Sequence, residues 1–229
     1  MAAFSGCAVG DAVALLRASM NHLLPALRVQ GLTFGYPHRP VFENFEARLL
    51  PGPNLVRGDE STGKTTLLRL LAGDLVPQAG NLVLELPGRP PAAAPFRNHV
   101  AWFDPRSDAL EGQTPRDWYG RLPQSQAAWD AAALQGHVQG FMLEPHLDKP
   151  FGALSTGTRR KVLMAGAFAC AAPLTLIDEP VAGLDKASVA YLALALKQLA
   201  MCTDRMVVVA HYEALAGVPW AQVVDLPGA

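Results

Sequence analysis

The feature that most constrains this chain is the stretch GDESTGKT at residues 58–65, which matches the pattern G-x-x-x-x-G-K-[ST] in full. Its glycines let the backbone turn tightly, so that successive N–H groups can point at phosphate oxygens. Lys64 has the reach to contact the outer phosphates of a nucleotide, and the hydroxyl of Thr65 suits Mg²⁺. A strand-like stretch precedes the loop, and a helix-like stretch that ends at Gly73 follows it. This order predicts a phosphate-binding loop formed by Gly58, Asp59, Glu60, Ser61, Thr62, Gly63, Lys64, Thr65 and Thr66.

A second motif lies further along the chain, where the apolar stretch LTLI ends in Asp178 and Glu179. Such a stretch is typical of a buried strand whose last residues reach the edge of a sheet. There Asp178 is suited to hold Mg²⁺ through water, and Glu179 to polarise the water that attacks a γ-phosphate. A strand that leaves the core and has no catalytic role would show the same sequence pattern. The position downstream of a phosphate-binding loop favours the catalytic interpretation.

The alternation of strand-like and helix-like stretches predicts an α/β fold with a mostly parallel sheet. From Ala26 to the turn PGPN at 51–54, β-forming residues separated by turns predict an antiparallel β region. The proline-rich stretch at 87–95 predicts a loop, and NHVAWF at 98–103 predicts a strand. The β pattern then disappears, which predicts a small helical subdomain at about 107–157.

Composition limits the class of protein. The 229 residues, of which 50% are hydrophobic and 17% charged, suffice for one domain with a sizeable core. A formal net charge of −1 indicates no basic surface, so no nucleic acid partner is expected. No apolar run approaches the roughly 18–20 residues that cross a bilayer. Cys7, Cys170 and Cys202 are far apart, which predicts free thiols in a reducing cytosol.

Residues 1–25 are interpreted as an N-terminal extension. A secretory signal is not expected, because no basic segment precedes the short apolar piece and Asp11 interrupts it. Apolar residues at helical spacing predict an appended helix. They are Val13, Leu16, Met20, Leu23 and Leu24. An alternative is that synthesis begins at Met20.

The stretch LSTGTRRK at 154–161 narrows the class further. Here the chain resembles the ATP-binding cassette (ABC) family, whose signature is usually written LSGGQ. The order of motifs agrees with the resemblance: Tyr36 precedes the phosphate loop, the signature precedes the acidic pair, and AGLD and His211 follow. The resemblance covers nearly all of the chain from about residue 26. It implies a P-loop NTPase domain at 26–229 with a RecA-like core.

The resemblance also implies roles for single residues, each of which has an ordinary structural alternative. Tyr36 would stack on the adenine ring, or be a turn tyrosine. Ser155 and Gly157 would approach the γ-phosphate bound by a second copy of the chain, or belong to a helix cap. Asp185 would lie at the seam between two copies, or cap the next helix. His211 would contact the γ-phosphate, or be a surface histidine after a strand.

In this family two cassettes face head to tail with two ATP between them, and hydrolysis drives a membrane subunit. The resemblance therefore implies an ATPase that uses ATP and Mg²⁺, with Lys64, Glu179 and His211 as catalytic residues. Its partners would be an integral membrane permease and a second cassette, in a homodimer or a mixed pair. The expected location is the cytoplasmic face of the cell membrane. Two alternatives remain open: a regulatory subunit that hydrolyses ATP weakly, and a soluble ABC-type ATPase outside transport.

One departure from the family pattern concerns the metal. Where the family has a glutamine that touches Mg²⁺, alignment puts Asp104. A carboxylate can still ligate Mg²⁺, although it adds negative charge near the γ-phosphate. The predicted metal ligands are therefore Thr65, Asp104 and Asp178.

Other departures change the two loops. Ser61 replaces a glycine that is usual in the phosphate loop, so a strained or reshaped backbone is expected there. Thr156 and Thr158 replace the second-position glycine and the glutamine of the signature. Because no predicted catalytic group is lost, we expect an active ATPase, and these departures leave open whether its turnover is slow.

Overall fold

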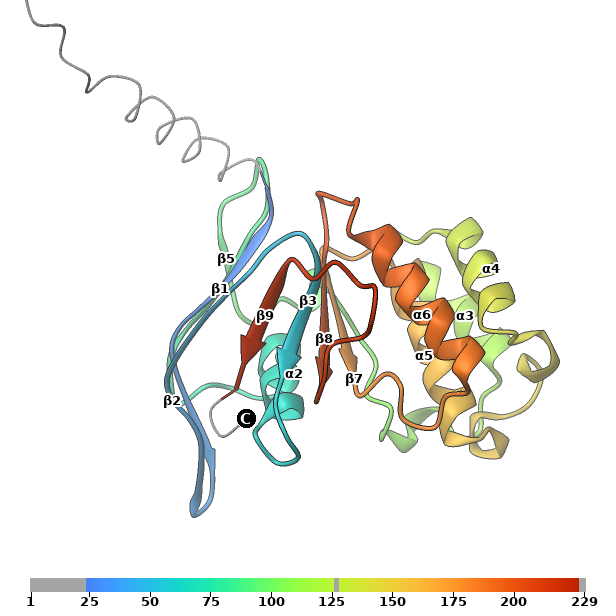
Figure 1. The fold of residues 1–229 in the computed structure, drawn as a ribbon, viewed down its shortest axis with the longest axis horizontal. Coiled ribbons are helices and arrows are strands. Elements are labelled where there is room, and N and C mark those ends of the chain that lie inside the picture. The colour runs from blue at the N-terminus through green and yellow to red at the C-terminus, as the bar shows by residue number, and fades with distance from the viewer. Residues whose placement is uncertain (1–23, 126–127, 227–229) are drawn as a thin grey trace, which may run out of the picture.

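The computed structural model describes residues 24–125 and 128–226. Two sheets and a group of helices form the molecule (Figure 1). The predicted N-terminal helix, the alternative start at Met20 and the free thiol expected at Cys7 lie outside the described residues. Of the other cysteines, Cys170 is buried, Cys202 is partly buried, and both are free thiols.

The first sheet is antiparallel, as the β-rich front of the chain predicted. Its strands, in sheet order, are β2 (Arg39–Leu49), β1 (Ala26–Tyr36), β4 (Ala79–Glu85) and β5 (Ala92–Ala93). The pairing of β1 with β2 shifts register at several points, including between Val29 and Leu32. The two-residue strand β5 corrects the prediction of a loop at 87–95, because Ala92 and Ala93 pair with Leu84 and Val83 of β4.

The second sheet is parallel and lies at the centre of the molecule. Its strands, in sheet order, are β6 (Val100–Trp102), β7 (Leu174–Asp178), β8 (Met206–His211), β3 (Gly52–Arg57) and β9 (Gln222–Asp225). Residues of β8 alternate between two hydrophobic cores, with Val207 and Val209 facing one and Val208 the other. The sheet is therefore covered on both faces, as is typical of parallel sheets.

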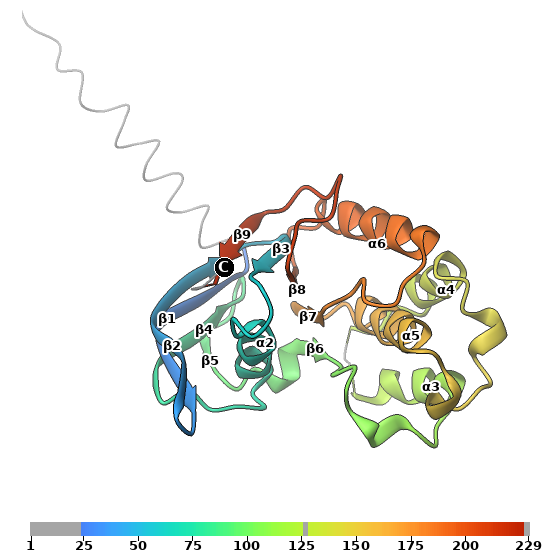
Figure 2. The same ribbon diagram turned by 60° about the horizontal axis from the view of Figure 1, so that its bottom comes forward.

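Helices cover the two faces of the parallel sheet. Figure 2 shows α2 (Lys64–Ala72) enclosed between the two sheets. Gly73 ends this helix in the left-handed region, at φ 79°. On the other face lie α3 (Pro115–Ser125), α4 (Ala131–Gly140), α5 (Thr156–Ala169) and α6 (Lys186–Leu199). Short 3₁₀ helices occur at Arg97–His99, Asp108–Leu110, Glu144–His146 and Phe151–Ala153.

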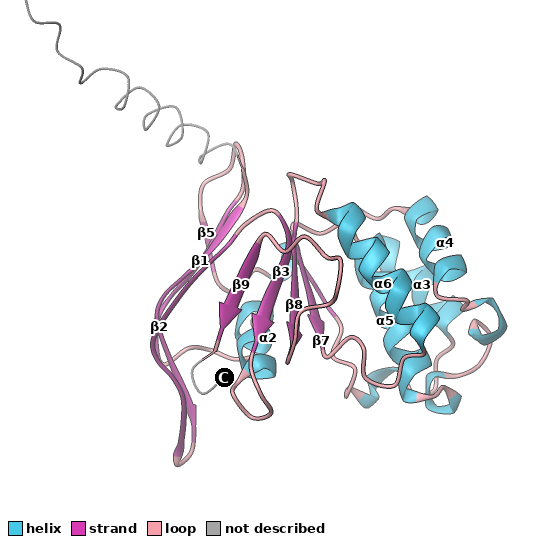
Figure 3. Ribbon diagram, viewed as in Figure 1, coloured by secondary structure: helices cyan, strands magenta, loops and turns pink. Residues whose placement is uncertain are grey.

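The two cores divide the molecule into two regions. We call the two sheets with α2 the sheet half, and α3 to α6 the helical half. Figures 1 and 3 show that β3, β7, β8 and β9 all end at the same edge of the molecule, where α2 begins. The carboxyl edge of a parallel sheet is where α/β proteins bind ligands.

The predicted fold class is confirmed, and the differences concern the ends of elements. The strand expected at 98–103 begins as a 3₁₀ turn, so that only Val100–Trp102 pairs with β7. Helix α5 begins at Thr156, directly after Ser155, which caps it. In the part of the chain that the structure describes, no helix is both long and apolar enough to span a bilayer.

Candidate active site

The loop between β3 and α2 adopts the tight path that its glycines predicted. Gly63 has φ 102°, a conformation that side chains with a Cβ rarely adopt. A Cβ on Gly58 would overlap the hydroxyl of Thr62. Ser61 also lies in the left-handed region, at φ 64°, so the strain expected from its replacing a glycine is present. Arg39, at the start of β2, donates from Nη2 to the carbonyl of Ser61 at 3.0 Å and holds the loop in this shape.

Lys64 is held by the loop itself. Its ammonium donates to the carbonyls of Gly58 at 2.7 Å and Asp59 at 2.8 Å. The same nitrogen lies 3.3 Å from Oε1 of Glu179. Since Lys64 is buried, these oxygens provide the partners that a buried cation requires.

Glu179 directly follows β7 and has φ 46°, a strained value for a residue with a side chain. Its Oε2 lies 2.8 Å from Nδ1 of His211, the last residue of β8. Burial alone would raise the pKa of Glu179, but the hydrogen bond to His211 and the charge of Lys64 outweigh it, so the pKa is lowered. His211 is buried, and its Nε2 has no hydrogen-bond partner among the described residues.

Asp178 and Thr65 meet at the same edge of the sheet. The hydroxyl of Thr65 donates to Oδ2 of Asp178 at 2.8 Å. Burial raises the pKa of Asp178, and the neighbouring Glu179 and Asp104 raise it further, against the hydrogen bond from Thr65 and the charge of Arg106. The second carboxylate oxygen, Oδ1, is buried and accepts no hydrogen bond from any described group.

These groups fit the chemistry of Mg²⁺, which prefers oxygen ligands. A hydroxyl and a carboxylate with one unpartnered buried oxygen lie together, and both come from predicted metal ligands. In residues 24–125 and 128–226, this site included, no group of three or more His, Cys, Asp or Glu side chains is arranged to hold a metal. Phosphate oxygens of a nucleotide would therefore have to complete the coordination.

Asp104 does not contact Thr65 or Asp178 by any hydrogen bond in the structure. Its Oδ1 accepts from the backbone N–H of Arg106 at 2.9 Å, so that this carboxylate shapes its own loop. Arg106 takes the position instead: its Nη2 lies 3.1 Å from Thr65 Oγ1 and 2.9 Å from Asp178 Oδ2. Sequence reasoning missed Arg106, because its only signal is a basic residue two positions after the expected metal ligand.

An open cleft of about 740 Å³ lies beside these groups and is lined by Lys64, Thr65 and Glu179, but not by the buried Asp178 and His211. Tyr36 lies at its rim, 40% exposed, with its hydroxyl 3.4 Å from that of Thr66. The edge-to-face contact of Tyr36 with Phe34, at 5.2 Å between ring centroids, orients the ring. The predicted residues that line the cleft are Tyr36, Asp59, Glu60, Ser61, Gly63, Lys64, Thr65, Thr66 and Glu179. Lining residues that sequence reasoning missed are Arg39, Val41, Arg106, Arg160, Ala182 and Tyr212.

Ser155 and Gly157 of the signature lie in the helical half and do not line that cleft. Ser155 caps α5, since its hydroxyl accepts from the N–H of Thr158 at 3.2 Å. Gly157 packs against the loop after β7 so closely that a Cβ would overlap the carbonyl oxygen of Gly183. Asp185 caps α6 by accepting from the N–H of Ser188 at 2.8 Å. Both capping alternatives are therefore correct descriptions of the single chain, and the roles toward a second copy remain predictions.

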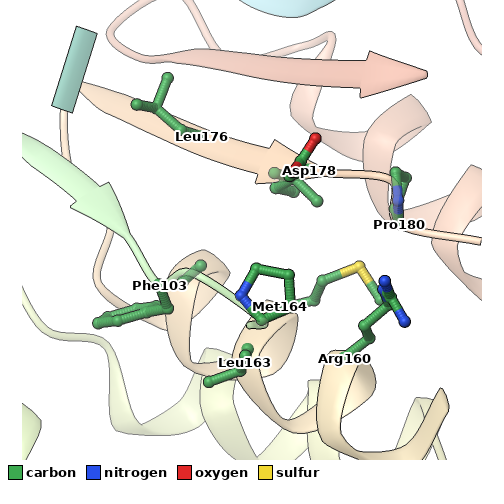
Figure 4. A pocket seen from close by; sticks show the side chains of 10 residues that line it. Phe103, Arg160, Leu163, Met164, Leu176, Asp178 and Pro180 are labelled. Atoms are coloured by element: carbon green, nitrogen blue, oxygen red, sulfur yellow. The ribbon is translucent and has the colours of Figure 1, made fainter. Parts of the chain in front are cut away.

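A second, much smaller cavity lies between β7 and α5 (Figure 4). It measures about 20 Å³ and is lined mainly by apolar side chains, among them Phe103, Leu163, Met164 and Leu176. Asp178, Arg160 and Pro180 lie along its rim. This volume holds roughly one water molecule, so it is no site for a nucleotide.

Comparison with known proteins adds the following findings. The family model described as ABC transporter matches residues 52–182, more than half of the chain. A cytochrome c biogenesis ATP-binding export protein CcmA of Pseudomonas fluorescens is 33% identical over 177 residues, which cover 73% of this chain and 80% of the relative. The ABC transporter ATP-binding protein RamB of Streptomyces coelicolor is 35% identical over 204 residues, 82% of this chain and 32% of RamB.

Solved structures show the same fold at low identity. An ATP-binding subunit of an ABC transporter superposes with a TM-score of 0.72 at 22% identity, covering 87% of this chain and 85% of its own. A bacterial Atm1-family ABC exporter with ATP bound gives a TM-score of 0.69 at 18% identity, covering 89% of this chain and 37% of the exporter.

Proposed function

This chain belongs to the ABC transporter family, and from that premise we propose that it is the ATP-hydrolysing subunit of an export system whose membrane-spanning permease is a separate polypeptide. The observation that carries the proposal is the convergence of five predicted residues at one edge of the sheet. They are Lys64, Thr65, Asp178, Glu179 and His211, linked by contacts of 2.8–3.3 Å.

ATP would bind along the cleft, with its phosphates in the loop and its adenine at the rim. The loop N–H groups and the start of α2 attract phosphate oxygens. Lys64 would exchange the loop carbonyls for the outer phosphates, and Tyr36 would present its ring to the base. Mg²⁺, when bound beside Thr65 and Asp178, would neutralise charge on the phosphates.

Glu179 would act as the base that orients and polarises the attacking water. Its lowered pKa keeps it ionised, which this role requires. His211 holds Glu179 through Nδ1, and its Nε2 is left to contact the γ-phosphate. The strained backbone of Glu179 supports a functional reading, since such strain clusters at active sites.

A second copy of the chain, or a similar cassette, would complete each site. Ser155 and Gly157 at the start of α5 would approach the γ-phosphate held by the partner, and Asp185 would lie near the seam. Figure 1 supports this arrangement, because α5 begins at the same edge of the molecule as the phosphate loop, yet in the other half. A head-to-tail pair would bring the phosphate loop of one copy opposite the start of α5 in the other.

The direction and class of transport are proposed from the relatives. Several of the most similar curated proteins are named as ATP-binding export proteins of cytochrome c biogenesis. We therefore assign this chain to an exporter of that type, working at the cytoplasmic face of a membrane. Purification from membranes is the corresponding test: the chain should copurify with a multi-span polypeptide, and recovery of this chain alone from gently solubilised membranes would contradict the assignment.

Steady-state ATP hydrolysis tests the catalytic part of the proposal. Replacing Glu179→Gln removes the base and should lower kcat by about a hundredfold or more, while ATP still binds. Glu144→Gln, an exposed glutamate of the helical half, is the matched control and should leave kcat unchanged.

The regulatory alternative is favoured by one observation, the arginine that occupies the predicted metal position. A chain of that kind would close on ATP but scarcely turn over. Equal hydrolysis rates for the unmodified protein and Glu179→Gln would support it and overturn the catalytic proposal.

A further inference from the structure

Arg106 reaches from an exposed loop into the predicted metal position. Its side chain is 58% exposed, whereas that of Asp178 is fully buried. One nitrogen, Nη2, lies within hydrogen-bond distance of both Thr65 Oγ1 and Asp178 Oδ2, which are themselves 2.8 Å apart. The guanidinium therefore joins the same two oxygens that are suited to a cation.

The charges around Asp178 explain why a cation is needed there without a nucleotide. The Asp178 carboxylate is buried next to Glu179, and an unpaired buried carboxylate is costly. Lys64 is already engaged by two loop carbonyls and by Glu179. Among the described residues, Arg106 is the cation that contacts Asp178.

The loop is built to present Arg106 and also to release it. Asp104 accepts the backbone N–H of Arg106 and fixes the start of the side chain. The rest of the Arg106 side chain lies along the open cleft, which Lys64 and Thr65 also line. Once its contacts with Thr65 and Asp178 are broken, this long side chain can move aside without a change of fold.

We propose that Arg106 is a built-in cation of the nucleotide-free site, which pairs with Asp178 and Thr65 until Mg²⁺ and nucleotide displace it. Asp104 is then a positioning residue for Arg106. When nucleotide arrives without Mg²⁺, Arg106 supplies the positive charge that the phosphates and Asp178 would otherwise lack. This second step rests on the proposed ATP-binding function, but the pairing in the nucleotide-free site does not.

A double-mutant cycle without nucleotide tests the pairing. Arg106→Ala should lower the Tm of the full chain by roughly 2–4 °C. In an Asp178→Asn background, where the carboxylate charge is gone, the same change should have little effect. Arg116→Ala is the matched control, because Arg116 is 59% exposed and pairs with Asp148 far from the cleft. An equal loss from Arg106→Ala in both backgrounds would overturn the proposal.

Nucleotide affinity tests the displacement. ATP binding to each full-length variant is measured by calorimetry in excess MgCl₂ and in excess EDTA. The quantity compared is the Kd in EDTA divided by the Kd in MgCl₂. Arg106→Ala should raise this ratio about tenfold, while Arg106→Lys, which keeps the charge, should stay near the unmodified protein. The same ratio in all three proteins would overturn the displacement step. Absence of ATP binding in every protein would reject the proposed function, and the nucleotide-free cycle would still decide whether Arg106 pairs with Asp178.

Discussion

The sheet half and the helical half present their predicted site residues in different ways. In the sheet half, Glu179 contacts both Lys64 and His211 across the ends of strands. In the helical half, Ser155 and Gly157 are engaged by their own chain, as a helix cap and a close packing contact. The sheet half therefore forms its site within a single copy, whereas the role proposed for the helical half requires a partner.

The sharpest test of this difference alters the charge of Ser155 without altering the cap. Aspartate and asparagine both cap helices well, so Ser155→Asp and Ser155→Asn should preserve α5. Under the proposed pairing, only Ser155→Asp would place a negative charge against the γ-phosphate that the partner holds. We expect its kcat to fall by about a hundredfold, roughly 2.7 kcal/mol, with Ser155→Asn falling far less.

Binding of ATP to a single copy separates a role of Ser155 toward a partner from a role as a helix cap only. Neither Ser155 variant should change the Kd of the monomer for ATP, because Ser155 does not line the cleft of its own chain. Full activity of Ser155→Asp would mean that Ser155 is only a cap.

The next largest effect concerns Gly157, whose contact lies within the chain. A methyl group there would overlap the carbonyl oxygen of Gly183, so Gly157→Ala should lower the free energy of unfolding by about 1–3 kcal/mol. Gly136→Ala is the control, because Gly136 lies in α4 with open space around it and should gain about 0.5–1 kcal/mol. Urea unfolding measures both. If Gly157→Ala is stable but hydrolyses ATP poorly, the packing role is contradicted and Gly157 acts in partner recognition.

Low pH should destabilise the helical half. The pKa of His137 is lowered to about 4, first by burial and then by the charge of Arg205, while Asp130 opposes the shift. Because the unfolded chain then binds more protons between pH 6.5 and 4, stability is lost as the pH falls through that window, by roughly 3 kcal/mol.

His137→Gln should flatten this loss, as measured by urea unfolding at pH 7, 6, 5 and 4. The histidine contacts Tyr191 at 2.9 Å, which ties α4 to α6. His99→Gln, in the sheet half, is the control. An identical slope in His137→Gln would show that another group carries the acid sensitivity.

The sequence predicted what depends on local pattern and missed what depends on distant contacts. The phosphate loop, the acidic pair and the strand that ends at His211 were predicted because each motif implies its own backbone shape. The contact of Arg106 with Asp178 joins residues 72 positions apart, and nothing local indicates which way that side chain turns. Likewise, β5 forms inside a proline-rich stretch only because β4 is there to pair with it.

The smallest effect returns to the sheet half, at Ser61. Its φ of 64° costs a residue with a Cβ roughly 1–2 kcal/mol, and the bond from Arg39 to its carbonyl helps to hold that conformation. Ser61→Gly removes the strain but makes the unfolded chain more flexible, which offsets about 0.5–1 kcal/mol of the gain. We therefore expect a net increase in unfolding free energy of about 0.5 kcal/mol by urea titration, with Arg39→Ala moving in the opposite direction. A loss of stability in Ser61→Gly would mean that the serine side chain contributes to the loop and that its strain is not what distinguishes this half of the site.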